Sequence, residues 1–170
     1  MNFQIKIVKK VNIYLIFGFI LLLFPTVVFA QGNGLYEFRG NDGKYGFMDK
    51  TGKIIIKPKY HIVNYPGFSE GLVFVSEKKT ANGDYIWICI DTTGKTVFEL
   101  ANNCEPEESF NEGYAVISNW VTDTYWYVDK IGKKVFNKKF GEACEFTNGY
   151  ARVSDKNIDY SKSYFIDRNG

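Results

Sequence analysis

The chain has 170 residues, and residues 31–170 are enough for one domain that buries about two-thirds of its unfolded surface. The first thirty residues hold three of the 21 basic residues and none of the 19 acidic ones, so the remainder has a net charge of −1. This balance argues against nucleic acid or an anionic membrane as a partner, because both require a basic surface.

The first thirty residues have the parts of a secretory signal peptide. Three lysines lie within the first ten residues, residues 13–24 are continuously apolar, and Pro25 ends that run. Small residues at Val28 and Ala30 complete the pattern, which predicts cleavage after Ala30 and export to the periplasm or the cell exterior. The alternative is a membrane anchor, because residues 11–30 are long enough to span marginally. No membrane association is expected after cleavage.

A short motif, Asp-x-x-Gly, returns four times in the rest of the chain. The steps from glycine to glycine are 42, 38 and 38 residues, and each motif follows an apolar stretch rich in aromatic residues. A period of this size is typical of a repeat array, in which neighbouring units bury one another's apolar faces. The motifs are Asp49–Gly52, Asp91–Gly94, Asp129–Gly132 and Asp167–Gly170.

The first repeat illustrates the expected local structure. Residues 45–48 read as a strand, Asp49 to Gly52 as a type I turn, and residues 53–56 as the return strand of a hairpin. Pro58 is expected to end the return strand, because proline has no amide hydrogen for a ladder.

A second motif, Phe-x-x-Gly, opens a third strand in each repeat; its glycines are Gly71, Gly113 and Gly149. No part of residues 31–170 shows sustained helical periodicity, so the predicted fold class is all-β. Tandem repeats of about three short antiparallel strands are expected to form an open array, solenoid-like or, alternatively, an incomplete propeller-like arc. The expected divisions are a signal peptide (1–30), a lead-in (31–44), repeats 45–84, 85–124 and 125–162, and a truncated repeat (163–170).

The first strand of each repeat is apolar on both faces, which indicates burial between layers. Cys89 aligns with Phe47, and Cys104 aligns with Tyr60 if a two-residue insertion is allowed. Both cysteines are therefore expected to be small core residues, and no disulfide is expected despite the third cysteine, Cys144.

Candidates for chemistry are few. The four turn aspartates lack the closely spaced oxygen ligands of a calcium loop, so no metal is expected. His61 is the only histidine and has no visible catalytic partners. The acidic residues Glu105, Glu107 and Glu108 resemble a solvated loop more than a glycosidase pair. We therefore expect neither enzymatic activity nor a cofactor.

The repeats resemble the WG-repeat family of bacterial proteins. The first repeat matches the family pattern through Tyr45–Asp49, Gly52–Lys53, Pro58–Tyr60 and Phe68–Leu72. The later repeats keep both motifs but replace the namesake glycine by Ile88 and Trp126 and lose the proline. The resemblance covers residues 45–170 and implies an exported all-β scaffold with a binding role and no catalytic residues.

Two functions remain open from the sequence. The preferred one is an interaction scaffold that binds a protein; the alternative is a carbohydrate-binding module that uses exposed aromatic residues, for which Trp120 and Tyr160 are the candidates. The sequence ends at Gly170, so the strand at 164–166 is expected to have an open edge that a strand of another chain could join. Fraying of a shortened last repeat is the alternative.

Overall fold

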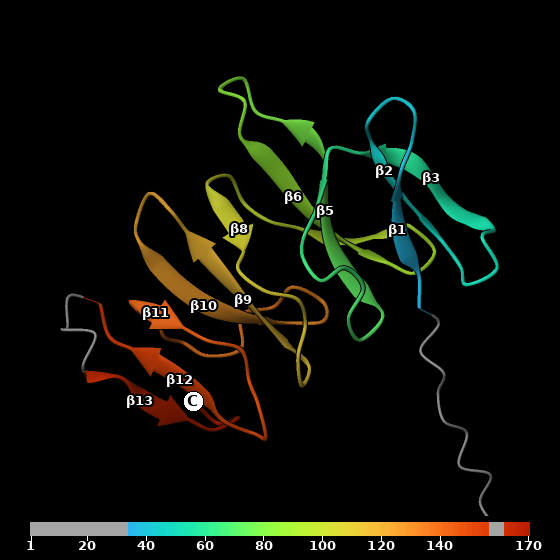
Figure 1. Cartoon of the computed structure of the whole chain (residues 1–170). Helices are drawn as coiled ribbons and strands as arrows, with labels where there is room; N and C mark the ends of the chain where they lie inside the picture. Colours follow the sequence, from blue (N-terminus) through green and yellow to red (C-terminus); the bar gives the residue numbers. More distant parts are fainter. Residues whose placement is uncertain (1–33, 157–161) are drawn as a thin grey trace, which may run out of the picture. The chain divides into compact units, whose positions relative to one another are not determined.

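The computed structural model describes residues 34–156 and 162–170 (Figure 1). The expected signal peptide and Tyr160 lie outside these residues. Residues 33–170 form one compact unit. The described part of the chain contains no helix of the length and apolarity needed to span a membrane.

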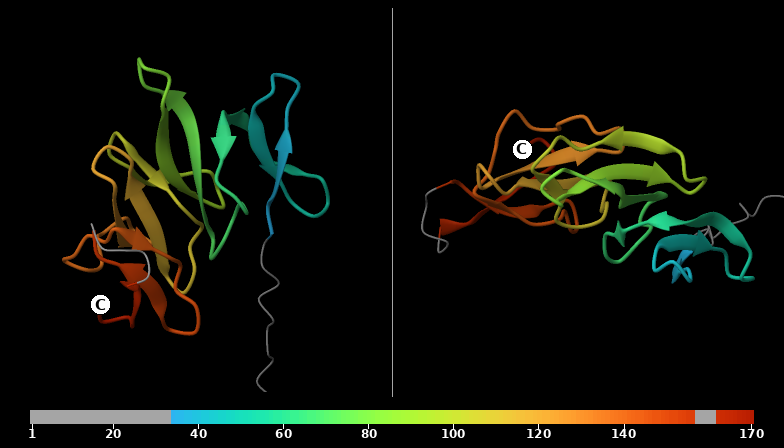
Figure 2. Two further views of the ribbon diagram at one scale, coloured as in Figure 1. Left: turned by 60° about the vertical axis from the view of Figure 1, so that its left-hand side comes forward. Right: turned by 90° about the horizontal axis from the view of Figure 1, so that it is seen from above.

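In the described residues, thirteen short strands form four antiparallel sheets, which confirms the all-β prediction (Figures 1 and 2). None of the sheets closes into a barrel. Sheet A contains β1 (Tyr36–Arg39), β2 (Tyr45–Met48) and β3 (Ile54–Tyr60). Sheet B contains β4 (Ile62–Val63), β5 (Leu72–Lys79), β6 (Tyr85–Asp91) and β7 (Thr96–Glu99). Sheet C contains β8 (Cys104–Pro106), β9 (Tyr114–Asn119) and β10 (Thr124–Asp129), and sheet D contains β11 (Glu142–Ala143), β12 (Ala151–Ser154) and β13 (Tyr164–Ile166).

The sheets do not coincide with the sequence repeats. In sheet B, β4 and β5 come from the first repeat, whereas β6 and β7 come from the second. The strand that follows Phe-x-x-Gly therefore pairs with the first strand of the next repeat, as in the register Leu72↔Asp91. Each repeat is consequently joined to the next by a backbone hydrogen-bond ladder as well as by side-chain packing.

The predicted hairpin of the first repeat forms, but the expectation that Pro58 ends its return strand is wrong. Tyr45 pairs with Tyr60 and Phe47 pairs with Ile56, so β3 passes Pro58 with extra residues bulged out of the ladder. The bulge brings the backbone of β3 close to Gly46, where an added Cβ would lie 2.6 Å from the carbonyl oxygen of Ile56.

The second repeat lacks both the proline and the glycine, and its ladder is different. Ile88 pairs directly with Glu99 there, so a side chain is accommodated where the first repeat requires glycine. The loss of the namesake glycine and the loss of the proline are thus linked.

The alignment of Cys104 with Tyr60 is also wrong. Tyr60 pairs with Tyr45, and the matching position in the second repeat is Leu100, whose amide donates to the carbonyl of Trp87 at 2.9 Å. Cys104 instead begins β8 after an inserted loop and pairs with Asn119. Leu100 and Cys104 are both apolar and buried in the same core, so the residue types alone do not show which of them matches Tyr60.

Three apolar cores lie between successive sheets. We call the face of a sheet that contacts the preceding sheet its leading face, and the opposite face its trailing face. In sheet B the leading face carries Val73, Val75 and Ile90, and the trailing face carries Leu72, Phe74 and Cys89. The first core joins Phe47, Ile56 and Tyr60 of sheet A to the leading face of sheet B. The second core joins the trailing face of sheet B to Ala115, Ile117 and Val128 of sheet C. The third core joins Val116 and Tyr127 of sheet C to Ala151, Val153 and Ile166 of sheet D.

Burial of the first strands on both faces is confirmed for the inner sheets. Cys89 and Ile90 are both fully buried, as are Tyr127 and Val128. The expectation is wrong for β13, where Ile166 is buried but Phe165 is 71% exposed. The physical reason is that no described segment covers the trailing face of sheet D.

Candidate functional site

The turn aspartates hold the hairpin turns. Asp49 Oδ1 accepts hydrogen bonds from the amide of Thr51 at 2.8 Å, from its hydroxyl at 2.6 Å, and from the amide of Lys53 at 3.1 Å. These donors lower the pKa of Asp49, the hydroxyl of Thr51 contributing most. Matching side-chain-to-amide bonds are made by Asp91, Asp129 and Asp167. Each carboxylate is therefore engaged with its own turn.

The turn glycines lie at the repeat junctions. An added Cβ on Gly94 would lie 3.2 Å from Ile56, and one on Gly132 would lie 2.5 Å from Phe98. The same holds for Gly170, which approaches Phe136 to 2.7 Å, whereas Gly52 has open space. In each case the contacted residue belongs to the preceding repeat and lies four positions after that repeat's own turn glycine. Ile56 follows Gly52 in this way, Phe98 follows Gly94, and Phe136 follows Gly132. The glycines Gly52, Gly94, Gly132, Gly170, Gly71, Gly113 and Gly149 all have positive φ.

A ladder of glutamates connects each of the first two repeats to the next two, and sequence reasoning missed it. Glu70 Oε2 accepts from the amide of Gly113 at 3.0 Å and pairs with Lys130 at 3.0 Å. Glu112 repeats this arrangement with Gly149 at 2.8 Å and Arg168 at 2.9 Å. The sequence signal was present: a glutamate before the Phe-x-x-Gly glycine in the first two repeats, and a cation after the last two turn aspartates.

A buried serine also recurs five residues after each Phe-x-x-Gly glycine. The hydroxyl of Ser76 donates to the carbonyl of Lys78 at 2.7 Å. The recurring buried serines are Ser76, Ser118 and Ser154. These positions are structural, because each lies on a strand that contributes residues to an apolar core.

The remaining polar candidates do not converge on a site. Among residues 34–156 and 162–170, no three His, Cys, Asp or Glu side chains are grouped so that they could hold a metal ion. The expected acidic residues Glu105, Glu107 and Glu108 are all exposed, and Glu108 lies near Glu145. Partial burial and the neighbouring carboxylate of Glu145 raise the pKa of Glu108.

All three cysteines are free thiols. Burial raises the pKa of Cys89 to about 12, so this thiol stays protonated and unreactive at neutral pH. Cys104 is also buried, and Cys144 is partly exposed.

Of the two aromatic candidates for a glycan platform, only Trp120 lies in the described chain. It stands at the turn between β9 and β10 and is 53% exposed, beside the exposed Val121. Asn119 holds this turn by accepting from the amides of Val121 and Thr122.

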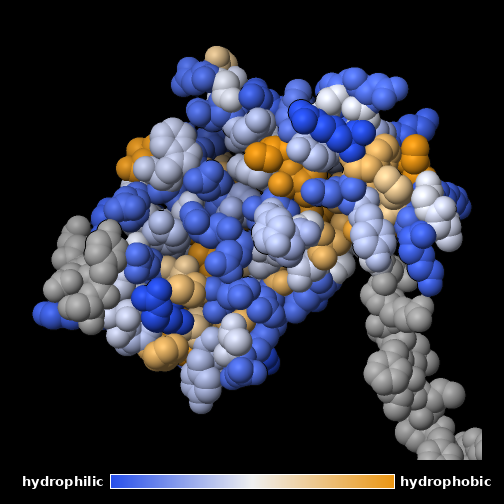
Figure 3. Space-filling view, viewed as in Figure 1, coloured by the Kyte–Doolittle hydropathy of each residue, from blue (hydrophilic) through white to orange (hydrophobic). Residues whose placement is uncertain are grey.

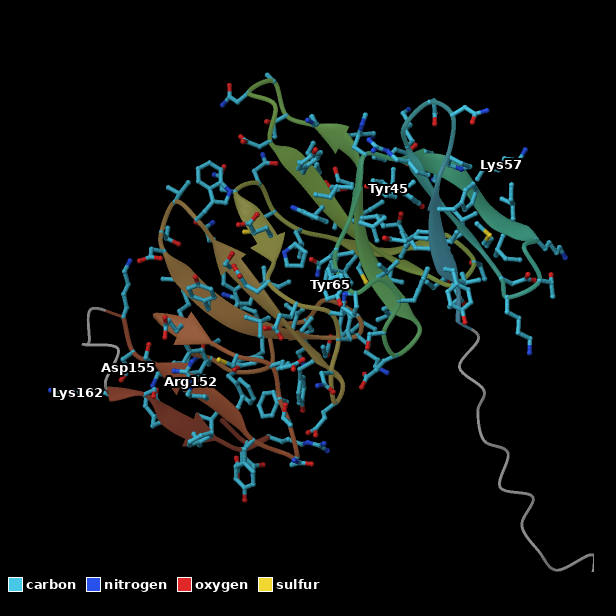
Figure 4. All side chains as sticks on the ribbon, viewed as in Figure 1. Tyr45, Lys57, Tyr65, Arg152, Asp155 and Lys162 are labelled. Carbon is cyan, nitrogen blue, oxygen red and sulfur yellow. The ribbon has the colours of Figure 1, made fainter. Side chains whose placement is uncertain are left out.

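The trailing face of sheet D is an uncovered feature that the sequence did not predict. Tyr150 is 58% exposed, and Phe165 stands opposite the exposed Arg152 in the β12–β13 ladder. Arg152 lies on β12 and Asp155 just beyond its end (Figure 4). A groove of about 710 Å³ runs beside β13, lined by Tyr150 and Phe165 together with Phe136 and Ile166.

One wall of the groove is fixed by an ion pair. Lys138 Nζ lies 2.8 Å from Asp155 Oδ1, and the hydroxyl of Tyr164 donates to the same oxygen at 2.8 Å. These contacts tie the segment before β11 to β12 and β13. The groove is therefore built on a well-connected base.

Comparison with known families gives one match. A family model described as "WG containing repeat" matches residues 45–79 and 127–157. The first match extends from β2 through β5, and the second extends from within β10 past the end of β12. No curated protein and no solved structure matches the chain.

Proposed function

Because this chain belongs to the WG-repeat family, we propose that it is a non-catalytic scaffold that binds another protein. The single observation that supports binding is the trailing face of sheet D. Two large aromatic side chains, Tyr150 and Phe165, are exposed there beside a groove, while the equivalent face of every other sheet is covered. Exposed apolar surface next to a groove is typical of interaction sites.

The test is affinity capture with residues 31–170 as bait in an envelope extract of the native host. The matched bait is Phe165→Asp, which changes an exposed side chain and should leave the fold intact. A protein retained by the first bait and lost by the second supports the proposal. Equal retention by both baits would reject this face as the binding surface.

A carbohydrate-binding role is the second candidate, and the exposure of Trp120 favours it. Here capture should disappear after glycan-degrading treatment of the extract and with the Trp120→Ala bait. The Phe165→Asp bait should then bind like the unmodified chain. Loss of capture with Phe165→Asp thus indicates protein binding, and loss of capture with Trp120→Ala indicates glycan binding.

We also propose that the protein is exported. The proposal rests on the basic start, the apolar run and the small residues before Gln31. Sequencing the N-terminus of the protein from the host should find Gln31 as the first residue. An N-terminus at Met1 in an envelope fraction would instead favour the membrane-anchor alternative.

A further inference from the structure

The trailing face of sheet D has the same residue pattern as a face that is covered. In sheet A, Leu35 and Phe47 pack into the first core, and Glu37 stands opposite Phe47 in the β1–β2 ladder. In sheet D, the corresponding residues are Tyr150, Phe165 and Arg152, with Arg152 opposite Phe165. Both faces thus present an apolar residue, a charged residue and a phenylalanine at matched positions.

The charged residue does not prevent another sheet from covering such a face. Glu37 remains exposed although sheet B covers Phe47 completely, because β1 lies at the margin of that junction. Arg152 stands at the matching ladder position, but β12 is the central strand of sheet D, so a sheet that covers Phe165 also covers the stem of Arg152. Its guanidinium keeps its hydration by extending past the junction, as long cationic side chains do.

The leading face of sheet A is the second face that no described segment of the chain covers. Tyr36 and Met48 are partners in the β1–β2 ladder, and Met48 is also the partner of Ile54, so the three side chains share one face. Tyr36 is 59% exposed and Ile54 is 51% exposed. Phe38 extends this face beside Gly46. In sheets B, C and D, the leading face is the one that packs on the preceding sheet.

The two uncovered faces are therefore the two halves of the junction that the chain already uses three times. We propose that the leading face of sheet A of one copy docks on the trailing face of sheet D of a second copy, so that copies associate head to tail. This inference rests on the proposed function, in that it names the partner of the trailing face of sheet D. The contact is heterologous, and it leaves each end of the assembly free to add a further copy.

Aromatic residues also occur on the internal leading faces. Trp126 lies on the leading face of sheet C and Tyr164 on that of sheet D, and each packs against the core shared with the preceding sheet. Tyr36 and Phe38 place aromatic residues on the leading face of sheet A in the same way. In Figure 3, apolar residues gather in separate areas over β12–β13 and over β2–β3.

Face-to-face docking differs from strand addition at the free edge of β13. Strand addition requires backbone pairing and does not require the leading face of sheet A. Face docking requires both faces. Single substitutions on the two faces can therefore separate the two modes.

The experiment uses residues 31–170, which include the whole compact unit, and measures mass by sedimentation velocity over a broad range of concentration. The unmodified chain should form a concentration-dependent series of oligomers. Tyr36 matches Val73, Ala115 and Ala151, which are buried at the internal junctions. Tyr36→Asp and Phe165→Asp should each abolish the series, because a buried, unpaired carboxylate weakens association by about a hundredfold or more. A 1:1 mixture of the two variants should recover a dimer and nothing larger, since each variant keeps one intact face.

Trp120→Asp is the matched control, because it places the same charge on an exposed aromatic position outside both faces, and its oligomers should be unchanged. Circular dichroism confirms that each variant is folded. A symmetric dimer retained by Tyr36→Asp, or association retained by Phe165→Asp, would overturn head-to-tail docking. A monomeric unmodified chain that still captures another protein would overturn this inference and leave the proposed function standing.

Discussion

A turn glycine at a repeat junction meets two separate demands. Gly132 has a φ of 82°, a conformation that side chains disfavour, and it also lies against the ring of Phe98. Gly52 has nearly the same φ, 83°, but nothing lies near its missing side chain. Gly52 therefore reports only the cost of placing a side chain at positive φ, whereas Gly132 reports that cost together with the cost of a close contact with Phe98.

Substitution by alanine should affect the two glycines differently. Gly52→Ala should lower the free energy of unfolding by about 1–2 kcal/mol, the cost of a left-handed conformation. Gly132→Ala should lower it by roughly a further 1–3 kcal/mol, because the new methyl group overpacks the junction against Phe98. Denaturant unfolding of the two variants measures the difference. Equal losses would show that packing at the junction places no demand on the residue.

Local rules predict the turns but not these contacts. The Asp-x-x-Gly spacing alone indicates the turn, because aspartate and glycine act within four residues. The contact of Gly132 with Phe98 and the bond from Gly113 to Glu70 link residues more than thirty positions apart. Such contacts depend on how one repeat stacks on another, which local sequence does not specify.

At the scale of elements, the hairpins follow from sequence and the sheets do not. The strands around Asp49 were predictable from their apolar and β-branched residues. The pairing of β5 with β6 could not be predicted. The alternation of apolar side chains along β5 would be the same if β5 joined the hairpin of its own repeat or that of the next repeat. Near Pro58, a bulge allowed the strand to continue where the missing amide hydrogen predicted its end.

Tyr127 shows how one strand holds the next sheet. It lies on β10, its hydroxyl donates to the carbonyl of Cys144 at 2.7 Å, and its ring packs edge-on against Phe140 and Phe146. Burial raises the pKa of Tyr127, so the hydroxyl remains a donor throughout the physiological range. The hydroxyl and the ring therefore both fix the loop after β11 in place.

Two substitutions separate these contributions. Tyr127→Phe should lower the free energy of unfolding by about 1–3 kcal/mol, because a buried carbonyl loses its donor. Tyr127→Ala should lower it by about 3–5 kcal/mol through the cavity that it leaves. Tyr36→Phe is the control and should stay within about 0.5 kcal/mol, since Tyr36 is exposed. If Tyr127→Phe matched the control, the hydrogen bond would contribute nothing measurable.

Across the whole molecule, charge is unevenly distributed although its sum is near zero. Residues 81–124 contain eight acidic residues and one lysine, whereas residues 34–80 contain eight basic and five acidic residues. Residues 125–170 contain nine basic and six acidic residues. The glutamate ladder uses this distribution, because Glu112 of the acidic middle pairs with Arg168 of the basic last part. Net charge alone conceals such internal attraction.

The carboxylates whose pKa the fold shifts divide into two groups with opposite effects on stability. In the first group the folded state lowers the pKa through hydrogen bonds or a cation, so stability is full above the ordinary values near pH 4 and falls as pH drops through the lowered pKa. In the second group burial raises the pKa, so ionisation at neutral pH costs stability. The first group is Asp49, Asp91, Glu112, Asp155 and Asp167, and the second is Glu105 and Glu108.

Amide substitutions in the two groups should therefore shift the thermal midpoint in opposite directions. At pH 7, Asp91→Asn should lower the midpoint, because the charged acceptor of the Thr93 and Lys95 amides is lost. Glu108→Gln should raise it, because an ionised carboxylate no longer faces Glu145 from a partly buried position. Both differences should shrink as the carboxylates protonate below about pH 4. Thermal unfolding of both variants from pH 7 to pH 3 measures this, and shifts of the same sign at pH 7 would contradict the assignment.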